Sequence, residues 1–158
     1  MNEAEIRKIV QDTISSMKRD KSAMTLSLAD ELADAVLEEA GRMGVKAVVC
    51  VSDAAGNPKA VKVMDDAFLA SYDVATGKAY TVVALKMSTI DLKPLAQPGA
   101  SLYGIQFTNS GRIVIFGGGD PLVGDNGSII GGLGVSGGTE EQDTALSAYG
   151  KEYFETKM

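Results

Sequence analysis

Apolar residues near the start of the chain recur with the period of an α-helix. Six positions fall at spacings of three or four residues: Ile6, Ile9, Val10, Thr13, Ile14 and Met17. Asn2 can cap this helix because its side chain can accept a hydrogen bond from a free backbone amide of the first turn. The pattern predicts an amphipathic helix over residues 1–18, a polar linker at 19–23 and a separate domain at 24–158.

Within the domain, stretches with helical and strand-like patterns follow one another. In order they are a helix at 27–43 capped by Ser27, strands at 45–52 and 59–64 joined by a turn, helical segments on either side of Gly77, strands at 112–116 and 128–136 with a short one at 121–123, and a last helix with a Thr139–Gln142 capping box. Residues 101–108 have no clear period and are interpreted as a connector. Hairpin-joined strands with separate helices indicate an antiparallel α+β fold.

The composition narrows the classes of function. The chain has 158 residues, 45% hydrophobic residues and a net charge of −6, which suits one domain with its own core. An acidic chain lacks the positive surface that binds nucleic acid or anionic membrane. No apolar run reaches the roughly 20 residues that span a bilayer, and acidic residues interrupt the first twenty positions, so no secretory signal is predicted. The single cysteine, Cys50, excludes a disulfide framework and favours the cytoplasm.

The chain contains no histidine. This absence excludes a Ser-His-Asp triad, a Cys-His pair, a histidine-ligated zinc site and a histidine-ligated haem within one chain. No metal site is predicted.

Eleven of the eighteen glycines lie between Gly111 and Gly138. Glycine is costly to order, so this cluster indicates backbone that adopts a positive φ or lies close to another group. Backbone amides at turns and helix starts attract carboxylate or phosphate, which makes two loops of this window the predicted ligand site. Its residues are Gly117, Gly118, Gly119, Asp120, Pro121, Ser136, Gly137, Gly138 and Thr139. The alternative is that both loops are tight turns that serve the fold.

Two short motifs in the second loop do not carry their usual functions. Residues 132–137 satisfy G-x-G-x-x-G, but the 21 residues that follow do not provide the second strand and acidic residue of a dinucleotide fold. Residues 134–138 satisfy G-x-S-x-G, yet no histidine can activate Ser136. Lys78 is the remaining candidate base, and otherwise Ser136 is a small turn residue.

Three stretches resemble the GlcG/HbpS family, which includes the C-terminal domain of the propanediol-utilisation corrinoid adenosyltransferase. They are VSDAAGNPKAVKVMDDAFLASYDVATGKAYTVVAL, IFGGGDPLV, and GGLGVSGG followed by EEQDTALSAYG. The resemblance runs from about Met24 to Tyr153 and implies a five-stranded, profilin-like antiparallel sheet with helices packed on it. It adds Lys78 to the ligand site, where an ammonium could balance an anionic ligand, unless Lys78 is a solvated surface lysine. Asp143 matches an acidic position of the family, and capping or a salt bridge explains it equally well.

The N-terminal segment MNEAEIRKIVQDTISSMK resembles the encapsulation peptides of bacterial microcompartment cargo. On this interpretation residues 2–18 bind a shell protein or another cargo protein and place the chain in the microcompartment lumen. The contacts would come from Ile6, Ile9, Val10, Ile14 and Met17. The alternative is an ordinary helix packed on its own domain or on a partner subunit.

Together the resemblances imply a microcompartment-associated, cofactor-binding accessory protein that forms homo-oligomers. Members of the family bind haem and one branch is fused to an adenosyltransferase, so the expected cofactor is haem or cobalamin. Cobalamin needs no protein ligand to its cobalt, whereas haem would have no axial histidine and would need methionine, tyrosine or the cysteine in its place. The chain is too short for the adenosyltransferase domain and has no P-loop, so adenosyl transfer is not predicted.

Two other functions remain open. The family occurs beside glycolate utilisation, which favours an enzyme for a small hydroxy or oxo acid with Lys78, Asp120 or Asp143 as its base. A scaffold between shell and cargo would use the glycine loops for the fold alone.

Overall fold

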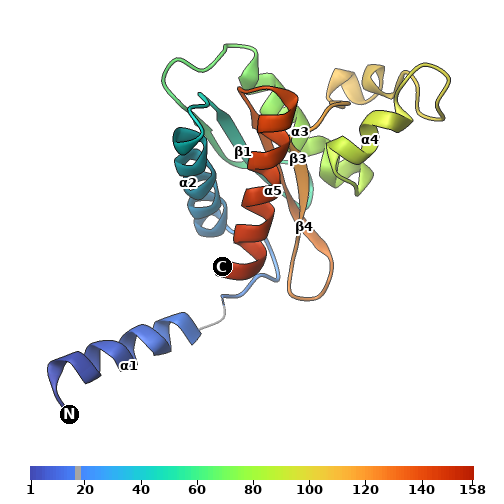
Figure 1. Cartoon of the computed structure of the whole chain (residues 1–158). Coiled ribbons are helices and arrows are strands. Elements are labelled where there is room, and N and C mark those ends of the chain that lie inside the picture. Colours follow the sequence, from blue (N-terminus) through green and yellow to red (C-terminus); the bar gives the residue numbers. More distant parts are fainter. Residues whose placement is uncertain (17–18) are drawn as a thin grey trace.

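Figure 1 shows a computed structural model of the chain, which describes residues 1–16 and 19–158. Helix α1 (Glu3–Ser16) lies apart from a domain that contains all the other elements. Asn2 caps this helix as predicted, because its Oδ1 accepts a hydrogen bond from the Glu5 amide at 2.9 Å.

The apolar stripe of α1 is not covered by the domain. Every residue from Met1 to Thr13 is exposed, including Ile6, Ile9 and Val10. The side chain of Ile14 and the whole of Met17 lie outside the described residues. Packing of α1 on its own domain is therefore not what the structure shows.

The domain is a three-layer arrangement around one antiparallel sheet. Four strands, in the spatial order β2-β1-β4-β3, form the middle layer. Helices α2 and α5 pack on one face of the sheet and α3 on the other. The bounds are α2 Leu26–Arg42, β1 Val48–Asp53, β2 Pro58–Val63, α3 Ser71–Leu85, α4 Thr89–Leu95, the 3-10 turns η1 Ile105–Phe107 and η2 Asn109–Gly111, β3 Gly119–Val123, β4 Ile129–Ser136 and α5 Glu140–Lys157. The antiparallel α+β prediction is confirmed, with four strands in place of five.

The larger core lies between the sheet and the α2/α5 layer. There Leu133 of β4, Val36 of α2 and Phe154 of α5 have no exposed surface. A smaller cluster joins the sheet to α3 and includes Cys50. Burial raises the pKa of the Cys50 thiol to about 12, so this side chain is an inert apolar residue at neutral pH.

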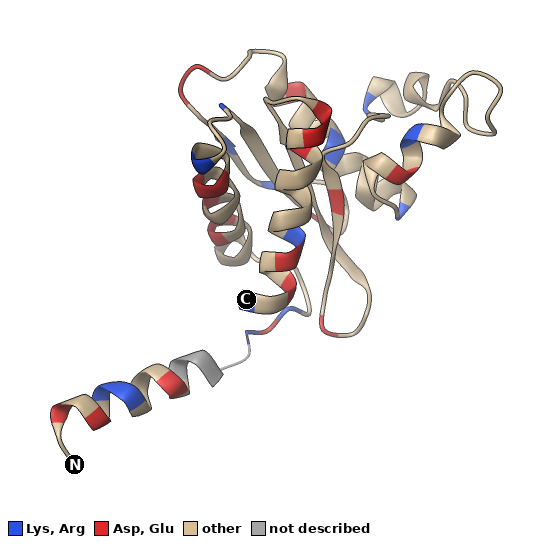
Figure 2. Cartoon of the chain, in the orientation of Figure 1, with Lys and Arg blue, Asp and Glu red and all other residues tan. Residues whose placement is uncertain are grey.

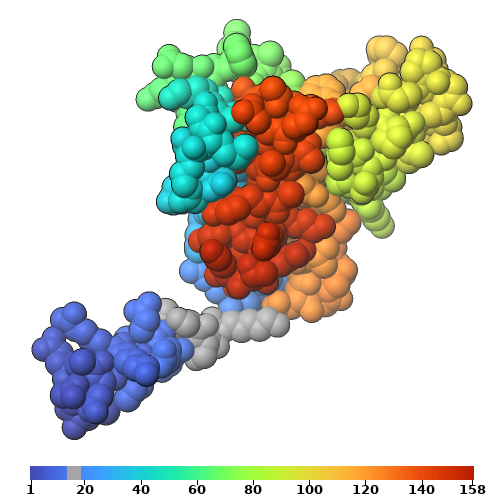
Figure 3. Space-filling view, in the orientation of Figure 1, coloured from blue at the N-terminus to red at the C-terminus, as the bar shows by residue number. Residues whose placement is uncertain are grey.

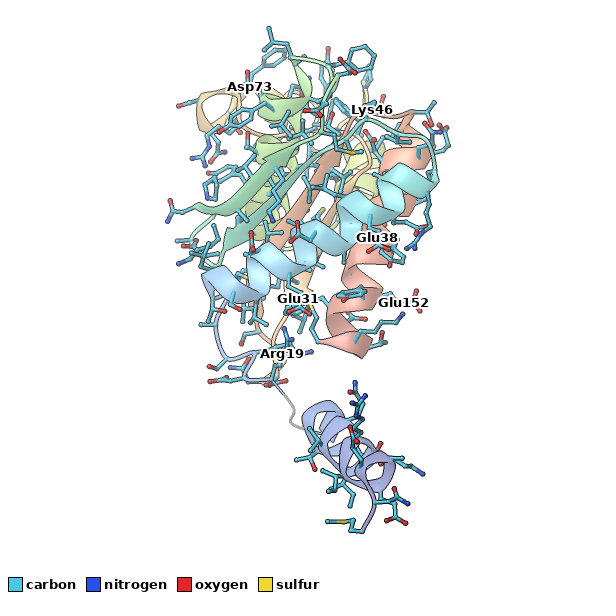
Figure 4. The ribbon with its side chains drawn as sticks, turned by 90° about the vertical axis from the view of Figure 1, so that its left-hand side faces the viewer. Arg19, Glu31, Glu38, Lys46, Asp73 and Glu152 are labelled. Carbon is cyan, nitrogen blue, oxygen red and sulfur yellow. The ribbon has the colours of Figure 1, made fainter. Side chains whose placement is uncertain are left out.

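The predicted linker is held against the domain from residue 19 onward. Arg19 forms an ion pair with Glu31 of α2 (Figure 4). Lys21 is buried, and its Nζ donates a hydrogen bond to the Phe154 carbonyl at 3.0 Å. The polar residues of this segment therefore fix it to the domain as well as connecting the domain to α1.

The strand predicted at 112–116 is wrong. This segment runs along α3 and its amides do not join the sheet: the Val114 amide donates to Thr81 Oγ1 at 2.9 Å. Its four consecutive apolar residues, three of them β-branched, satisfy the pattern of a buried strand, but the partner that they cover is a helix. Without this segment, the five predicted strands become the four of the sheet.

Two helix predictions also need correction, and one helix was missed. Gly77 lies inside α3 and does not break it; a Cβ there would come within 2.8 Å of Val114 Cγ2, so the missing side chain admits the 112–116 segment. Thr25, not Ser27, caps α2. Helix α4 was not predicted, because its seven residues include Pro94.

Charged residues are unevenly distributed over the surface. Acidic and basic side chains are spread over α1, α2 and α5, whereas residues 94–111 contain no charged residue (Figure 2). Among residues 1–16 and 19–158, no helix combines the length and apolar character needed to cross a bilayer.

Candidate functional site

Lys78 is the centre of the polar cluster that the sequence analysis singled out. It has no exposed surface. Its Nζ donates hydrogen bonds to the Val135 carbonyl at 2.7 Å and to Asp143 Oδ2 at 3.2 Å. Burial lowers the pKa of Lys78, and the Asp143 carboxylate opposes that shift. The interpretation of Lys78 as a solvated surface lysine is therefore wrong, and its ammonium already has partners inside the protein.

Asp143 connects the three layers of the domain at one end of the sheet. While its Oδ2 binds Lys78 of α3, its Oδ1 accepts a hydrogen bond from the Gly138 amide at 2.8 Å. Asp143 itself is 4% exposed, so the pair is a buried ion pair with additional hydrogen bonds. The salt-bridge interpretation of Asp143 is confirmed.

The first glycine loop is closed by side chains of the same chain. Gly117, Gly118 and Gly119 are buried. The Gly117 amide donates to Glu140 Oε2 at 3.2 Å, and the Gly119 amide donates to Thr89 Oγ1 at 2.9 Å. These two amides, which the sequence analysis offered to a ligand, are bound by side chains of α5 and α4 in the structure.

The second loop caps a helix and lies nearer the surface. Gly138 and Thr139 are exposed, and Thr139 forms the predicted capping box with Gln142. Ser136 is 7% exposed, and its hydroxyl donates to Ser71 Oγ at 3.2 Å. Ser136 thus bonds a side chain of α3, and a ligand that reached this loop would meet Gly138 and Thr139 first.

Asp120 and Pro121 belong to β3 and lie apart from Lys78. Asp120 Oδ2 accepts a hydrogen bond from Ser147 Oγ of α5 at 2.7 Å. Burial raises the pKa of Asp120, while this hydrogen bond and nearby Lys151 lower it. The structure therefore brings Lys78, Gly118 and Asp143 together but places Asp120 on the sheet face that α5 covers. Whether the glycine-loop residues bind a ligand stays a prediction.

A pocket of about 460 Å³ lies on the α3 side of the domain, where the sequence did not indicate one. The β1–β2 turn, the first two turns of α3 and residues 110–114 line it. Its aromatic and charged side chains are Tyr72, Asp73 and Arg112; Figure 4 labels Asp73 at the end of the domain opposite Arg19. The volume lies within the range of small-molecule pockets.

Arg112 is held in a defined orientation at this pocket. Its guanidinium carbon lies 3.6 Å from the centroid of the Tyr80 ring, and the Tyr80 hydroxyl donates to Asn109 Oδ1 at 2.9 Å. Asn109 and Ser110, with φ of 51° and 57°, both adopt the left-handed region that non-glycine residues avoid. A stacked guanidinium keeps its edge N–H groups available for a carboxylate, and strained backbone of this kind gathers at functional sites.

Residues 24–152 match the model of a family described as "Haem degrading protein HbpS-like". The chain belongs to the HbpS-like family. The match covers the whole domain except its last six residues and leaves α1 outside. The resemblance drawn from the glycine window is thereby confirmed.

Several proteins and structures are similar to this chain over most of its length. It is 48% identical over 126 residues to an uncharacterized 15.0 kDa protein in the dhaT-dhaS intergenic region of Citrobacter freundii, covering 80% of this chain and 88% of that protein. It is 42% identical over 131 residues to the corrinoid adenosyltransferase PduO of Salmonella typhimurium, covering 82% of this chain but only 39% of PduO. The crystal structure of a PduOC:heme complex superposes with a TM-score of 0.78 at 40% identity, covering 82% of this chain and 94% of PduOC.

Sequence reasoning missed the residues of the α3-side pocket. Arg112 was counted within a strand, and Tyr72 was one position of a helix with no apolar stripe. The signal that could have drawn attention is Asn109-Ser110-Gly111, three turn-forming residues immediately before the single charge between Lys93 and Asp120.

Proposed function

We propose that this chain is a haem-binding accessory protein that acts as a homo-oligomer, and that α1 directs it to the lumen of a bacterial microcompartment. The observation that carries the haem proposal is the likeness to PduOC, a 40% identical domain whose structure holds heme. Adenosyl transfer is not part of the proposal, since the chain spans 39% and 44% of the two PduO proteins that it matches.

The donor set of the chain decides which kind of haem site it can form. Haem iron in proteins is held by His, Cys, Met or Tyr. The chain has no histidine, and Cys50 is buried with a thiol pKa of about 12, so neither an imidazole nor a thiolate is available. The residues therefore do not fit a histidine-ligated haem. The remaining donors are methionine and tyrosine, so the chain fits a haem held without histidine or thiolate, by contact with aromatic side chains and by a cation for its carboxylates.

The α3-side pocket supplies these groups. Tyr72, which is 48% exposed, offers an aromatic ring and a phenol oxygen, and Arg112 offers a preoriented guanidinium for a propionate. Asp73 lies in the same lining and opposes an anionic ligand. Bound haem would supply a redox-active iron centre. The role of the protein residues is to bind the macrocycle and to orient its carboxylates.

An absorbance titration of the purified full chain with haemin tests the haem proposal. We expect a saturable shift of the haem absorption with one haem per chain. Arg112→Gln should weaken binding about tenfold, the loss of one charge-assisted hydrogen bond, and Tyr72→Phe should change the spectrum of the bound state. Asp73→Asn should tighten binding. The matched control is Tyr149→Phe, because Tyr149 belongs to α5, on the other face of the sheet, and lies outside the pocket lining.

Two results would redirect this proposal. If haemin gives a spectral shift that none of the variants changes, the α3-side pocket is not the haem site. Gly138 and Thr139 would then be the next residues to test. A shift with cobalamin and none with haemin would replace haem by a corrinoid, which requires no protein ligand to the metal.

The targeting role of α1 is supported by its exposure and its separation from the domain. Ile6, Ile9 and Val10 lie on one side of the helix and are 45%, 52% and 50% exposed. An apolar stripe of this kind suits a groove on another protein. We expect residues 1–18, fused to a fluorescent protein, to carry it into co-expressed microcompartment shells.

The helix face gives a matched control for this experiment. Ile9→Asp should leave the fusion diffuse, whereas Gln11→Asp introduces the same charge on the opposite side and should not. A wild-type fusion that stays diffuse, or equal loss from both substitutions, would remove the targeting role.

A further inference from the structure

A segment of the domain projects beyond α4 without covering any part of the core. This segment, called here the arm, consists of residues 97–111 and is drawn in yellow to orange in Figure 1. No residue of the arm is buried, although it contains Leu102, Tyr103, Ile105 and Phe107. Phe107 is 81% and Tyr103 64% exposed, and the space-filling view shows the arm standing out from the body of the domain (Figure 3).

The arm is nevertheless an ordered element. Two 3-10 turns, η1 and η2, shape it, and its end is fixed to α3 by the hydrogen bond from the Tyr80 hydroxyl to Asn109. The left-handed conformations of Asn109 and Ser110 cost free energy, which a random surface loop would avoid. The aromatic side chains are thus presented on a defined framework.

The arm also contains an unsatisfied polar atom. Gln106 Oε1 is buried, and no described donor binds it. A buried acceptor without a partner costs about 1–3 kcal/mol. Its pairing with a donor outside the chain, at a contact that covers the arm, would remove this cost.

We propose that the arm is the surface through which the chain associates with a second copy of itself. Exposed apolar side chains gathered on one segment are typical of an interaction site, and aromatic side chains without charges are typical of interface cores. The charge distribution selects the partner. Two copies that each carry −6 repel one another least when they meet through surfaces that bring no like charges into contact, and residues 94–111 form such a region. A basic partner would instead be attracted to the acidic surface of α2 and α5.

This inference deepens the proposed homo-oligomer and rests on it. The experiment is size-exclusion chromatography with light scattering on the full chain over a range of concentrations. We expect the wild-type chain to be a dimer or larger, and Phe107→Asp to raise the dissociation constant at least tenfold. Phe107→Leu, which keeps an apolar side chain, should associate nearly as well as the wild type.

Leu26→Asp is the matched control, because Leu26 is 63% exposed at the start of α2, at the other end of the domain. It should leave the oligomer intact. Far-ultraviolet circular dichroism verifies that each variant is folded, which is expected because the substituted side chains are exposed.

The outcomes separate the two levels of the proposal. A wild-type chain that stays monomeric at all concentrations overturns the homo-oligomer and the arm together, and leaves a different protein as the partner of the arm. A wild-type oligomer that Phe107→Asp does not weaken overturns the arm alone. Equal dissociation by Phe107→Asp and Leu26→Asp does the same.

Discussion

Gly118 lies directly over the ammonium of Lys78. A Cβ at position 118 would be 2.6 Å from Lys78 Nζ and 2.8 Å from the Val135 carbonyl oxygen, the two groups joined by the hydrogen bond beneath it. Gly118 also has a φ of +112°. The missing side chain is therefore a condition for the buried ion pair between Lys78 and Asp143.

Gly118→Ala should destabilise the domain by about 3 kcal/mol, because a left-handed backbone conformation and an overpacked site combine. Urea denaturation followed by circular dichroism measures the loss. Gly127→Ala is the control: its φ is +81°, but a Cβ there meets nothing within 4 Å. It should cost about 1 kcal/mol. Equal losses at the two positions would show that contact with Lys78 is unimportant.

Breaking the buried ion pair from either side should cost about 3–5 kcal/mol, because each single substitution leaves one buried charge without its partner. The substitutions are Lys78→Met and Asp143→Asn, the latter keeping an oxygen for the Gly138 amide. The double variant has no unpaired charge, so its loss should be smaller than the sum of the two. Strictly additive losses in denaturant titrations would mean that the two side chains do not act as a pair.

Asp120→Asn should stabilise the protein at neutral pH but not near pH 4. Burial raises the folded-state pKa of Asp120 above 3.8, so the folded chain takes up this proton at a higher pH than the unfolded chain does. The carboxylate therefore lowers stability above its folded pKa, and this penalty fades as the pH falls toward 3.8.

Unfolding titrations of both proteins at pH 7 and pH 4 measure this difference. Ser147→Ala should enlarge the penalty at pH 7, because it removes the hydrogen bond that lowers the pKa of Asp120. A gain from Asp120→Asn that is equal at both pH values would contradict the assignment.

Removal of residues 1–18 should change the free energy of unfolding by less than about 0.5 kcal/mol, since the described residues 1–13 are exposed and none of them belongs to the core. The truncation keeps Arg19 and Lys21, which bind Glu31 and Phe154. Differential scanning calorimetry gives the comparison. A marked loss of stability would support the alternative that α1 packs on the protein, in that case on a partner subunit.

The elements that could be predicted are those whose local pattern and long-range packing agree. The hairpin of β1 and β2, strand β4, the α5 capping box and the Asn2 cap all follow from short-range signals that the fold keeps. The segment at 112–116 has an equally good strand pattern, but a short run of apolar residues does not say whether a sheet or a helix receives their side chains. In the structure the Val114 amide binds Thr81 of α3, which is 33 residues away in sequence, so no local pattern could indicate this partner.

For the candidate site, the glycine cluster correctly predicted that the backbone comes close to another group. It did not predict which group that is. Close approach is present, yet the neighbours are Lys78, Thr89 and α5 where a ligand was expected. Tyr72 and Arg112 could not be associated from sequence, because their proximity depends on residues 110–114 lying along α3. The absence of histidine limits the chemistry whatever the fold is, because composition does not depend on how the chain packs.

The glycines of β4 have a mechanical consequence. A Cβ at Gly132 or Gly134 would collide with the carbonyl oxygen of Ala79 or Ala75, so α3 rests on the sheet backbone to backbone. Because no side chains separate the helix from the sheet here, the helix cannot slide or rotate without a clash between the two backbones. If a ligand or a partner changes the shape of this protein, the movement must occur outside the contact between α3 and β4. The arm and α1 both lie away from this contact.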